Sequence, residues 1–435
     1  MILLSLLAST LFAAQPAPLP PLAVETRTLS NGLTVLLHED HSSPLVTVNI
    51  WYKVGSKNEQ PGKTGFAHLF EHYMFEGSAH SPSGQYFNSV FGMGGETNAN
   101  TTNDRTDYYA VVPSENLEEV LRLESDRLGF LNINQPNLDK QRKIVKNEKR
   151  LRENQPYGGA WEAINAAAWP KGHPYAWPVI GSMADLDAAS LADVKAFHDR
   201  YYAPNNAVLV VSGDQENART FMMVEKWFGG LPRSATPPKL QTPAPDYNPG
   251  RRDVSITDDK AQMPMLFLIY RIPGKNRPGW QEASVAAQIL GGGRTSRLVQ
   301  ALQYDKRMVL SIDASVMGLQ EDDLFMIEAM PAPGVDLKRL EAAIVAEVDR
   351  LKAQGVTVKE LDRVKAGLRT STLNALQDAD GVAAQLAEGQ ARRGDPSAVI
   401  TDLNAVSRLQ PGPVQDAARK YLTPGNTAGL TILPK

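Results

Sequence analysis

Two histidines and a glutamate fall within five positions of this 435-residue chain, in the segment HLFEH that runs from His68 to His72. On a helix, positions i and i+4 lie on one face, so His68 and His72 can direct two imidazoles at one point, with Glu71 beside them. Neutral imidazoles suit Zn²⁺, and a neighbouring carboxylate can take a proton from metal-bound water. Histidine pairs at helical spacing are common on protein surfaces, but the added glutamate is rarer among only seven histidines. The segment therefore predicts a zinc site with Glu71 as general base.

Catalytic zinc usually takes three protein ligands and leaves one position for water, so a third ligand is expected elsewhere in the chain. Glu76 lies two helical turns from His68, and His80 falls in a predicted loop. Glu148 is the better candidate, because helical spacing places it on an otherwise apolar face. That face consists of Gln141, Ile144, Val145, Glu148 and Leu151. A buried carboxylate needs a partner, which is either the metal or, in the alternative interpretation, a nearby lysine.

His-x-x-Glu-His is the inverted zinc-peptidase motif, and three further segments resemble the pitrilysin/insulysin family, which includes insulin-degrading enzyme and mitochondrial processing peptidase. The family's distal glutamate ligand has a spacing that Glu148 matches, 76 residues after His72 (148 − 72 = 76). The similar segments are IVKNEKRLRENQPYG around Glu148, GGETNANTTNDRTDYYAVVP at 94–113 and LGGGRTSRL at 290–298. The resemblance covers nearly the whole chain after its first residues.

This resemblance implies an α+β fold of two similar halves, each a mostly antiparallel sheet with flanking helices, which together form one wall of a clamshell chamber. It implies a zinc metalloendopeptidase that hydrolyses peptides or small unfolded proteins in that chamber, with one Zn²⁺ per chain held by His68, His72 and Glu148. The alternative is a weakly catalytic or non-catalytic peptide-binding or structural subunit, because some family members have lost the motif. Since this chain retains Glu71 and all three ligand positions, the peptidase is favoured.

The resemblance also assigns residues around the metal. Asn98 and Ala99 match an Asn-Ala pair on an edge strand that binds substrate backbone, although a plain strand-edge turn is the other interpretation. Gln141 stands seven residues before Glu148 (148 − 141 = 7), where the family often has a second glutamate. A neutral amide can still form a hydrogen bond there, but the negative charge is lost.

A missing pair of residues points to a partner protein. Active members of the family carry an arginine and a tyrosine, seven residues apart, after the SRL segment of the second half. The corresponding residues here are Gln303 and Leu310, which offer neither a positive charge nor a hydrogen-bond donor to an oxyanion. We therefore expect a heterodimer with a homologous subunit that supplies the pair; a homodimer, or replacement by Tyr304 or Arg307, is the alternative.

The elements that must position these residues can be read from local patterns. Asn31-Gly32 between apolar alternations predicts a hairpin. Strands are expected at 44–56 and 106–113, and helices at 114–128 and 137–153. The helix that carries the histidines is expected to begin after Gly62 and Gly65 and to end at Gly77.

A repeat divides the chain. RYYAPNNAVLVVSGD begins at Arg200 and KYLTPGNTAGLTILP at Lys420, an offset of 220 residues (420 − 200 = 220). Each places a Tyr-x-x-Pro-x-Asn turn between a helix and a strand, which indicates duplication. A proline-rich linker separates the copies. The expected domains are a leader and spacer (1–22), a zinc-binding domain (23–230), the linker (231–251) and a homologous domain without zinc (252–435).

Composition excludes several classes of protein. The formal net charge of −3 argues against nucleic-acid binding, and the one basic cluster, from Lys140 to Arg152, is interpreted as the solvated face of a predicted helix. The chain has no cysteine, so nitrogen and oxygen must hold any metal. The apolar run MILLSLLASTLFAA is shorter than the roughly 20 residues of a membrane span and fits a signal peptide, with a buried N-terminal helix as the alternative. We therefore expect no membrane span and export to the periplasm of a Gram-negative bacterium.

Overall fold

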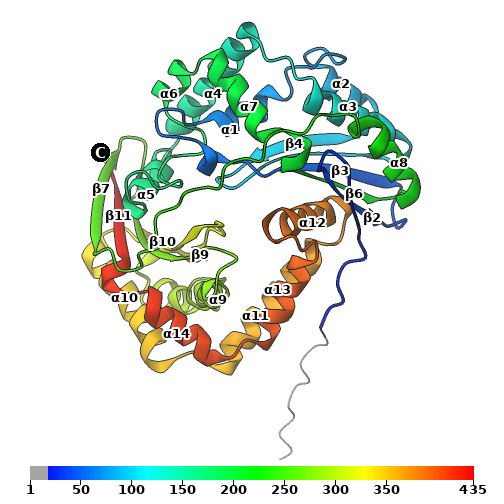
Figure 1. The fold of residues 1–435 in the computed structure, drawn as a ribbon. Helices are drawn as coiled ribbons and strands as arrows, with labels where there is room; N and C mark the ends of the chain where they lie inside the picture. Colours follow the sequence, from blue (N-terminus) through cyan, green and yellow to red (C-terminus); the bar gives the residue numbers. More distant parts are fainter. Residues whose placement is uncertain (1–17) are drawn as a thin grey trace, which may run out of the picture.

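Two β-sheets with flanking helices make up the computed structural model, which describes residues 18–435 (Figure 1). The predicted signal peptide lies outside the described residues and stays a prediction. The first sheet consists of β1 (Glu25–Thr28), β2 (Thr34–Glu39), β6 (Ala207–Gly213), β3 (Leu45–Tyr52), β5 (Thr106–Pro113) and β4 (Glu96–Thr101), in this order across the sheet. The second consists of β7 (Arg252–Asp258), β11 (Thr427–Pro434), β8 (Met265–Pro273), β10 (Asp322–Pro331) and β9 (Val309–Val316). The predicted α+β class is therefore confirmed.

The two sheets have the same topology when β1 is set aside. In each sheet one pair of neighbours is parallel, β2 with β6 and β7 with β11, and all the other described pairs are antiparallel. The Tyr-x-x-Pro-x-Asn turns also match. Asn206 Nδ2 donates to the carbonyl of Tyr201 at 2.8 Å, and Asn426 Nδ2 donates to that of Tyr421 at 2.7 Å. The halves are two copies of one fold, as the repeat predicted.

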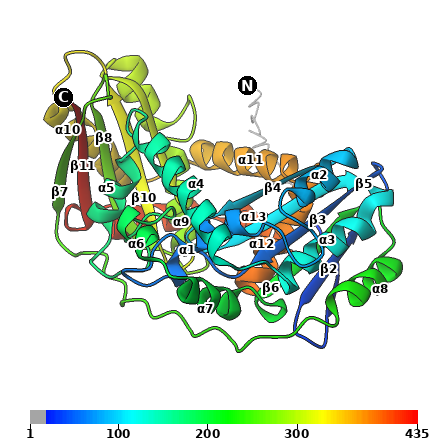
Figure 2. The same ribbon diagram turned by 90° about the horizontal axis from the view of Figure 1, so that it is seen from above.

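Helices cover the sheets on both sides (Figure 2). The first half contains α1 (Phe66–Tyr73), α2 (Gln85–Gly92), α3 (Leu117–Gly129), α4 (Gln135–Glu153), α5 (Ala160–Ala168), α6 (Met183–Ala188), α7 (Leu191–Tyr201) and α8 (Asn217–Phe228). The second contains α9 (Trp280–Leu290), a π-helical turn (Val299–Asp305), α10 (Leu337–Gln354), α11 (Val358–Asn374), α12 (Ala379–Arg393), α13 (Ala398–Arg408) and α14 (Pro411–Tyr421). None of the helices in residues 18–435 combines the length and the apolar character that crossing a membrane requires.

Most of the elements expected near the site form where the sequence placed them. β5 spans the predicted strand, and the hairpin at Asn31-Gly32 joins β1 to β2. α4 begins at Gln135, two residues earlier than expected, because the side chain of Asn134 caps it by accepting from Asn137 N at 2.9 Å. α1 ends at Tyr73, before Gly77, so its ending was predicted too late.

The two halves exchange helices. α12 of the second half packs across the first sheet, where Val382, Ala383, Leu386 and Ala387 meet the side chains of β2, β3 and β6 (Figure 1). In return, α5 packs on β7, β8 and β11 of the second sheet. Each half therefore buries an apolar sheet face that its own helices leave open. The predicted domain boundaries are not tested by this arrangement and stay a prediction.

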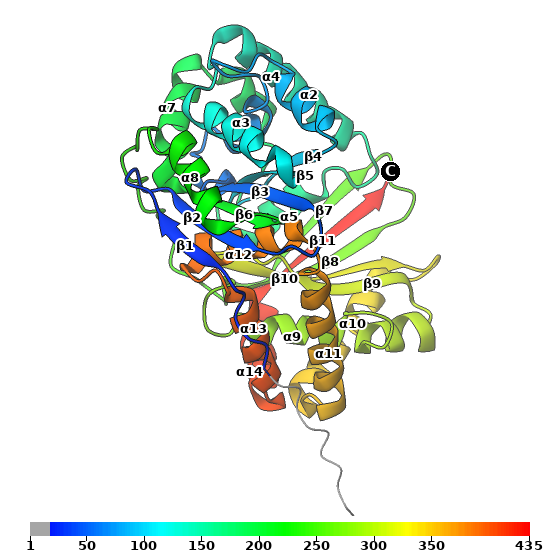
Figure 3. The same ribbon diagram turned by 90° about the vertical axis from the view of Figure 1, so that its right-hand side faces the viewer.

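The segment that precedes β1 also joins the halves (Figure 3). Leu22 and Val24 pack against the cluster formed by α12 and the first sheet. Leu19 N donates to Asn404 Oδ1 at 3.0 Å, and Asn404 Nδ2 donates to Leu19 O at 2.9 Å. One asparagine of α13 thus binds both backbone groups of Leu19.

Candidate metal centre

The helix that carries both histidines begins at a glycine that no other residue could replace without strain. Gly65 has φ of 90°, in the left-handed region, and a Cβ on it would lie 2.7 Å from Ile180 O. From this start, α1 brings His68 and His72 onto one face, with their ring centroids 4.9 Å apart and their planes at 75°. The predicted i, i+4 pairing of the imidazoles is therefore present.

Glu148 reaches these imidazoles from α4, which packs against α1. Its Oε2 atom lies 3.2 Å from His72 Nε2 and 3.6 Å from His68 Nε2. Within residues 18–435, this is the one group of three histidine or acidic side chains whose ligand atoms all lie within 4.8 Å of one another. Sequence spacing and the three-dimensional arrangement thus select the same three residues.

The charges of His68 and Glu148 suit a divalent cation. Burial lowers the pKa of His68 to about 4, so its imidazole is neutral at pH 7. The hydrogen bond with His72 holds the pKa of Glu148 below its usual value, so the carboxylate is ionised. Two neutral imidazoles and one carboxylate form the donor set of many catalytic zinc sites. The residues present therefore fit Zn²⁺.

The face of α4 around Glu148 differs from the prediction. Gln141 and Val145 are buried, but Ile144 is 41% exposed and Leu151 is 59% exposed. The predicted apolar face is therefore only partly buried. The alternative interpretation, in which a nearby lysine pairs with Glu148, is wrong. Lys149 pairs with Glu153 and Glu162 instead. The cation at Glu148 is Arg152, whose Nη2 lies 2.9 Å from Oε1. Oε1 is thus held by an arginine while Oε2 faces the imidazoles.

Gln141 forms no hydrogen bond with His68, His72 or Glu148 in the described part of the chain. Its Nε2 donates to Glu76 Oε1 at 2.6 Å, and Lys140 Nζ lies 2.8 Å from the same oxygen. These two contacts account for the buried carboxylate of Glu76, which the sequence had already excluded as a ligand. A role of Gln141 beside the metal stays a prediction.

A cavity of about 450 Å³ opens beside the histidines. His68, Glu71 and Glu148 line it, so Glu71 and two of the three ligand candidates face the same space. Its apolar wall comes from both halves and consists of Trp161, Trp169, Tyr175, Pro178, Val179, Ile180, Met317, Leu319 and Leu324. The sequence analysis missed this wall, because the contribution of the second half depends on how the two sheets pack and leaves no local pattern.

Asn98 and Ala99 lie on β4, which ends the first sheet and pairs only with β5 among the described strands. β4 also contacts α1. Arg105 fixes the end of this strand by donating to Asn100 O at 2.8 Å. The outer edge of β4 is therefore unpaired among the described strands and lies beside α1.

The positions of the missing arginine and tyrosine are neighbours in space. Gln303, in the π-helical turn, donates from Nε2 to Leu310 O at 2.8 Å, on the edge strand β9. The side chain of Leu310 is 48% exposed, and that of Tyr304 is 49% exposed. Residues at the two positions could thus act together, but Gln303 and Leu310 bring no charge and no hydroxyl.

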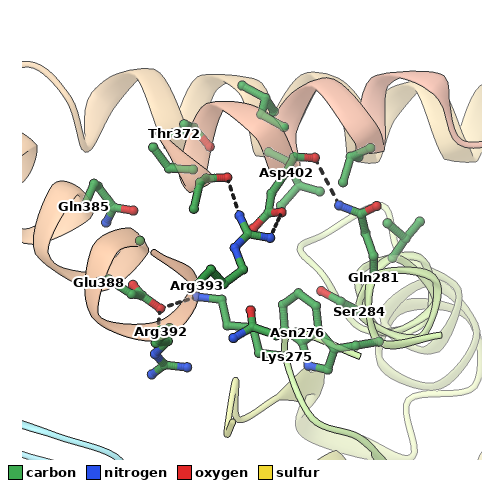
Figure 4. A pocket seen from close by; sticks show the side chains of 18 residues that line it. Lys275, Asn276, Gln281, Ser284, Thr372, Gln385, Glu388, Arg392, Arg393 and Asp402 are labelled. Carbon is green, nitrogen blue, oxygen red and sulfur yellow. Dashed lines mark hydrogen bonds and ion pairs between the residues drawn. The ribbon is translucent and has the colours of Figure 1, made fainter. Parts of the chain in front are cut away.

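A second cavity, of about 260 Å³, lies wholly within the second half, between α9, α11, α12 and α13 (Figure 4). Its charged side chains are already paired with one another. Lys275 Nζ lies 2.5 Å from Glu388 Oε1, and Arg393 Nη1 lies 2.7 Å from Asp402 Oδ1. No histidine lines it, so it offers none of the chemistry found in the first cavity.

Comparison with known proteins places the chain in a family. Residues 34–180 match the family described as insulinase (peptidase family M16), and residues 188–368 match the peptidase M16 inactive domain. The zinc protease PqqE of Helicobacter pylori is 31% identical over 322 residues, which cover 73% of this chain and 72% of that protein. The chain belongs to peptidase family M16, and the predicted family is confirmed.

Solved structures agree. The structure of a protease from Helicobacter pylori superposes with a TM-score of 0.89 at 28% identity and covers 95% of this chain and 100% of that one. The periplasmic protease PqqL of Escherichia coli shares the fold, with a TM-score of 0.79 at 19% identity over 96% of this chain and 48% of that one. Among sequence relatives, the beta subunit of the mitochondrial processing peptidase of Blastocladiella emersonii is 27% identical over half of this chain.

Proposed function

We propose that this chain is a zinc-dependent metalloendopeptidase that hydrolyses peptides or small unfolded proteins. The observation that carries the proposal is the cavity in which Glu71 faces the same space as His68 and Glu148, whose ligand atoms cluster with that of His72. The comparison with zinc proteases of family M16 supports it.

The roles of the residues follow from their chemistry. A Zn²⁺ ion held by the three side chains would polarise the peptide carbonyl and make a bound water more acidic. Glu71 takes the proton of the attacking water and passes it to the leaving amine. The outer edge of β4 at Asn98 and Ala99 pairs with the substrate backbone and holds it extended.

Metal analysis combined with cleavage of a quenched peptide library, with and without a chelator, tests this function. We expect one zinc per chain, cleavage of library peptides and loss of cleavage on chelation. Zinc binding without turnover would favour the alternative, a peptide-binding or structural subunit. A chain that neither binds zinc nor cleaves peptides would contradict the peptidase and favour a structural subunit.

We further propose that a second subunit completes the site. The two domains (23–230 and 252–435, joined by 231–251) form one wall of a chamber, and a homologous subunit with the Arg/Tyr pair would form the other. The purified chain should bind zinc but cleave weakly, and its homologue should raise kcat/KM by about 10²–10³-fold, the usual effect of an oxyanion donor. Peptidase assays of each chain and of the mixture measure this. Full activity of the chain alone, as a homodimer, would contradict the heterodimer.

Export to the periplasm of a Gram-negative cell is proposed from the apolar N-terminal run. We expect the mature protein to begin between Gln15 and Leu22. N-terminal sequencing of protein from the periplasmic fraction measures this. Because Asn404 binds both backbone groups of Leu19, cleavage before Leu19 would preserve that contact, and cleavage after it would lower Tm. Recovery of the whole chain, Met1 included, from the cytosol would contradict export.

A further inference from the structure

The N-terminus of α1 is capped by a residue from outside the helix. Gly65, the residue before the first turn, has no side chain to cap it. Glu59 takes this place: Oε2 accepts from Gly65 N at 2.8 Å, and Oε1 accepts from Ala67 N at 2.8 Å. His68 follows Ala67 directly, so this carboxyl group fixes the backbone of the turn that carries the first histidine.

Glu59 is an unusual residue to bury. It is 6% exposed and forms no ion pair within residues 18–435. Burial raises the pKa of Glu59 to about 8, and the N–H groups of Ala67, Gly65 and Phe66 act against that rise. Hydrogen bonds from the helix N-terminus thus offset part of the cost of burial. The two contacts use both of its oxygens, one for Gly65 N and one for Ala67 N.

The imidazole of His68 needs such support from its backbone. Metal-binding histidines usually have their second ring nitrogen fixed by a hydrogen bond. His68 Nδ1 is buried and has no hydrogen-bond partner among the described residues. The direction of the ring therefore depends on packing and on the position of the first turn of α1.

The second half shows that this fold can begin the same helix without Glu59. α9 also starts after a left-handed glycine, Gly279, with φ of 94° compared with 90° at Gly65. The connection from β8 to α9 is residues 274–279, GKNRPG, which contains no acid, whereas that from β3 to α1 is the longer segment 53–65. α9 carries no histidine. The external cap thus occurs in the half that carries the metal-ligand candidates.

We propose that Glu59 is a positioning residue of the metal centre, which holds the first turn of α1 so that His68 points at the space shared with His72 and Glu148. This inference rests on the proposed zinc site. Glu59 touches neither substrate nor metal, and it acts through the backbone of Gly65 and Ala67.

Zinc affinity of the full chain, measured at pH 7 by competition with a chelator, tests the proposal. In Glu59→Gln, the amide nitrogen cannot accept a hydrogen bond, so one of the two N–H groups loses its acceptor. Glu59→Asp keeps the carboxylate but is one methylene too short to reach both. We expect the zinc Kd to rise at least about 10-fold in both variants, because each leaves at least one of the two N–H groups without an acceptor, within the range for residues that orient ligands.

The matched control is Glu347→Gln on α10, a buried glutamate that is 5% exposed and pairs with Arg350. It should lower Tm but leave the zinc Kd within about twofold, since its effect is on stability alone. The d–d spectrum of the Co²⁺-substituted protein should change in the Glu59 variants and not in the control. If Glu59→Gln does not fold, the zinc Kd and the Co²⁺ spectrum of Glu59→Asp test the positioning role.

Native zinc affinity and an unchanged Co²⁺ spectrum in the Glu59 variants would overturn the positioning role and leave the zinc site intact. His72→Ala separates the two proposals, because it removes a proposed ligand. Native protein that binds zinc no better than His72→Ala would overturn the metal centre itself, and the role of Glu59 with it.

Discussion

Replacement of Glu71 by glutamine should leave zinc bound and lower kcat/KM for peptide cleavage by roughly 10²–10⁴-fold, the usual contribution of a general base. The amide has nearly the shape of the carboxylate but cannot accept the proton of the attacking water. The ligand atoms of His68, His72 and Glu148 are unchanged by this substitution, so metal content should stay at one zinc per chain. Steady-state kinetics and metal analysis of the same preparation measure the two effects.

A control for this variant is Glu115→Gln, an exposed glutamate outside the cavity. It should retain native kinetics, since it faces neither the cavity nor the ligands. If Glu71→Gln cleaved peptides at a near-native rate, another group would have to be the base. If it lost zinc as well, Glu71 would instead be needed to form the metal centre.

Local patterns predicted the parts of the site that depend on local structure. The i, i+4 spacing of His68 and His72 places them on one helical face wherever that helix lies. The Tyr-x-x-Pro-x-Asn turns formed as expected, because the asparagine closes the turn on the tyrosine carbonyl within the same segment. The spacing of Glu148 was informative only together with the family resemblance, because α1 and α4 meet through tertiary packing.

Local sequence patterns did not predict the contacts between segments that are distant along the chain. Ile144 and Leu151 were expected to pack inward, but α4 buries a narrower stripe and leaves both exposed. The exchange of α5 and α12 between the halves has no sequence signal, since either sheet could accept an amphipathic helix of that length. The cavity wall at Met317 and Leu324 follows from this exchange. The cap by Glu59 escaped notice because the residue lies six positions before Gly65, outside the helix.

Removal of the third ligand candidate, by Glu148→Gln, should weaken zinc binding by roughly 10²–10³-fold. Zinc sites of proteins bind with about 10–16 kcal/mol shared among three or four ligands, so one ligand contributes about 3–5 kcal/mol. An amide oxygen carries no charge and is a poor zinc ligand. Arg152, which now lies against Glu148 Oε1, would then face the metal without a carboxylate between them. Zinc Kd, measured by competition with a chelator, reports the change.

The control for Glu148→Gln is Glu153→Gln, five residues further along α4. Glu153 is 40% exposed and absent from the cluster of ligand atoms, and Lys149 keeps Glu162 as a partner, so substitution of Glu153 should leave the zinc Kd within about twofold. Equal losses in both variants would mean that the effect comes from the charge balance of α4 rather than from ligation. Native affinity in Glu148→Gln would remove Glu148 from the metal centre and leave His68 and His72 in need of a different third ligand.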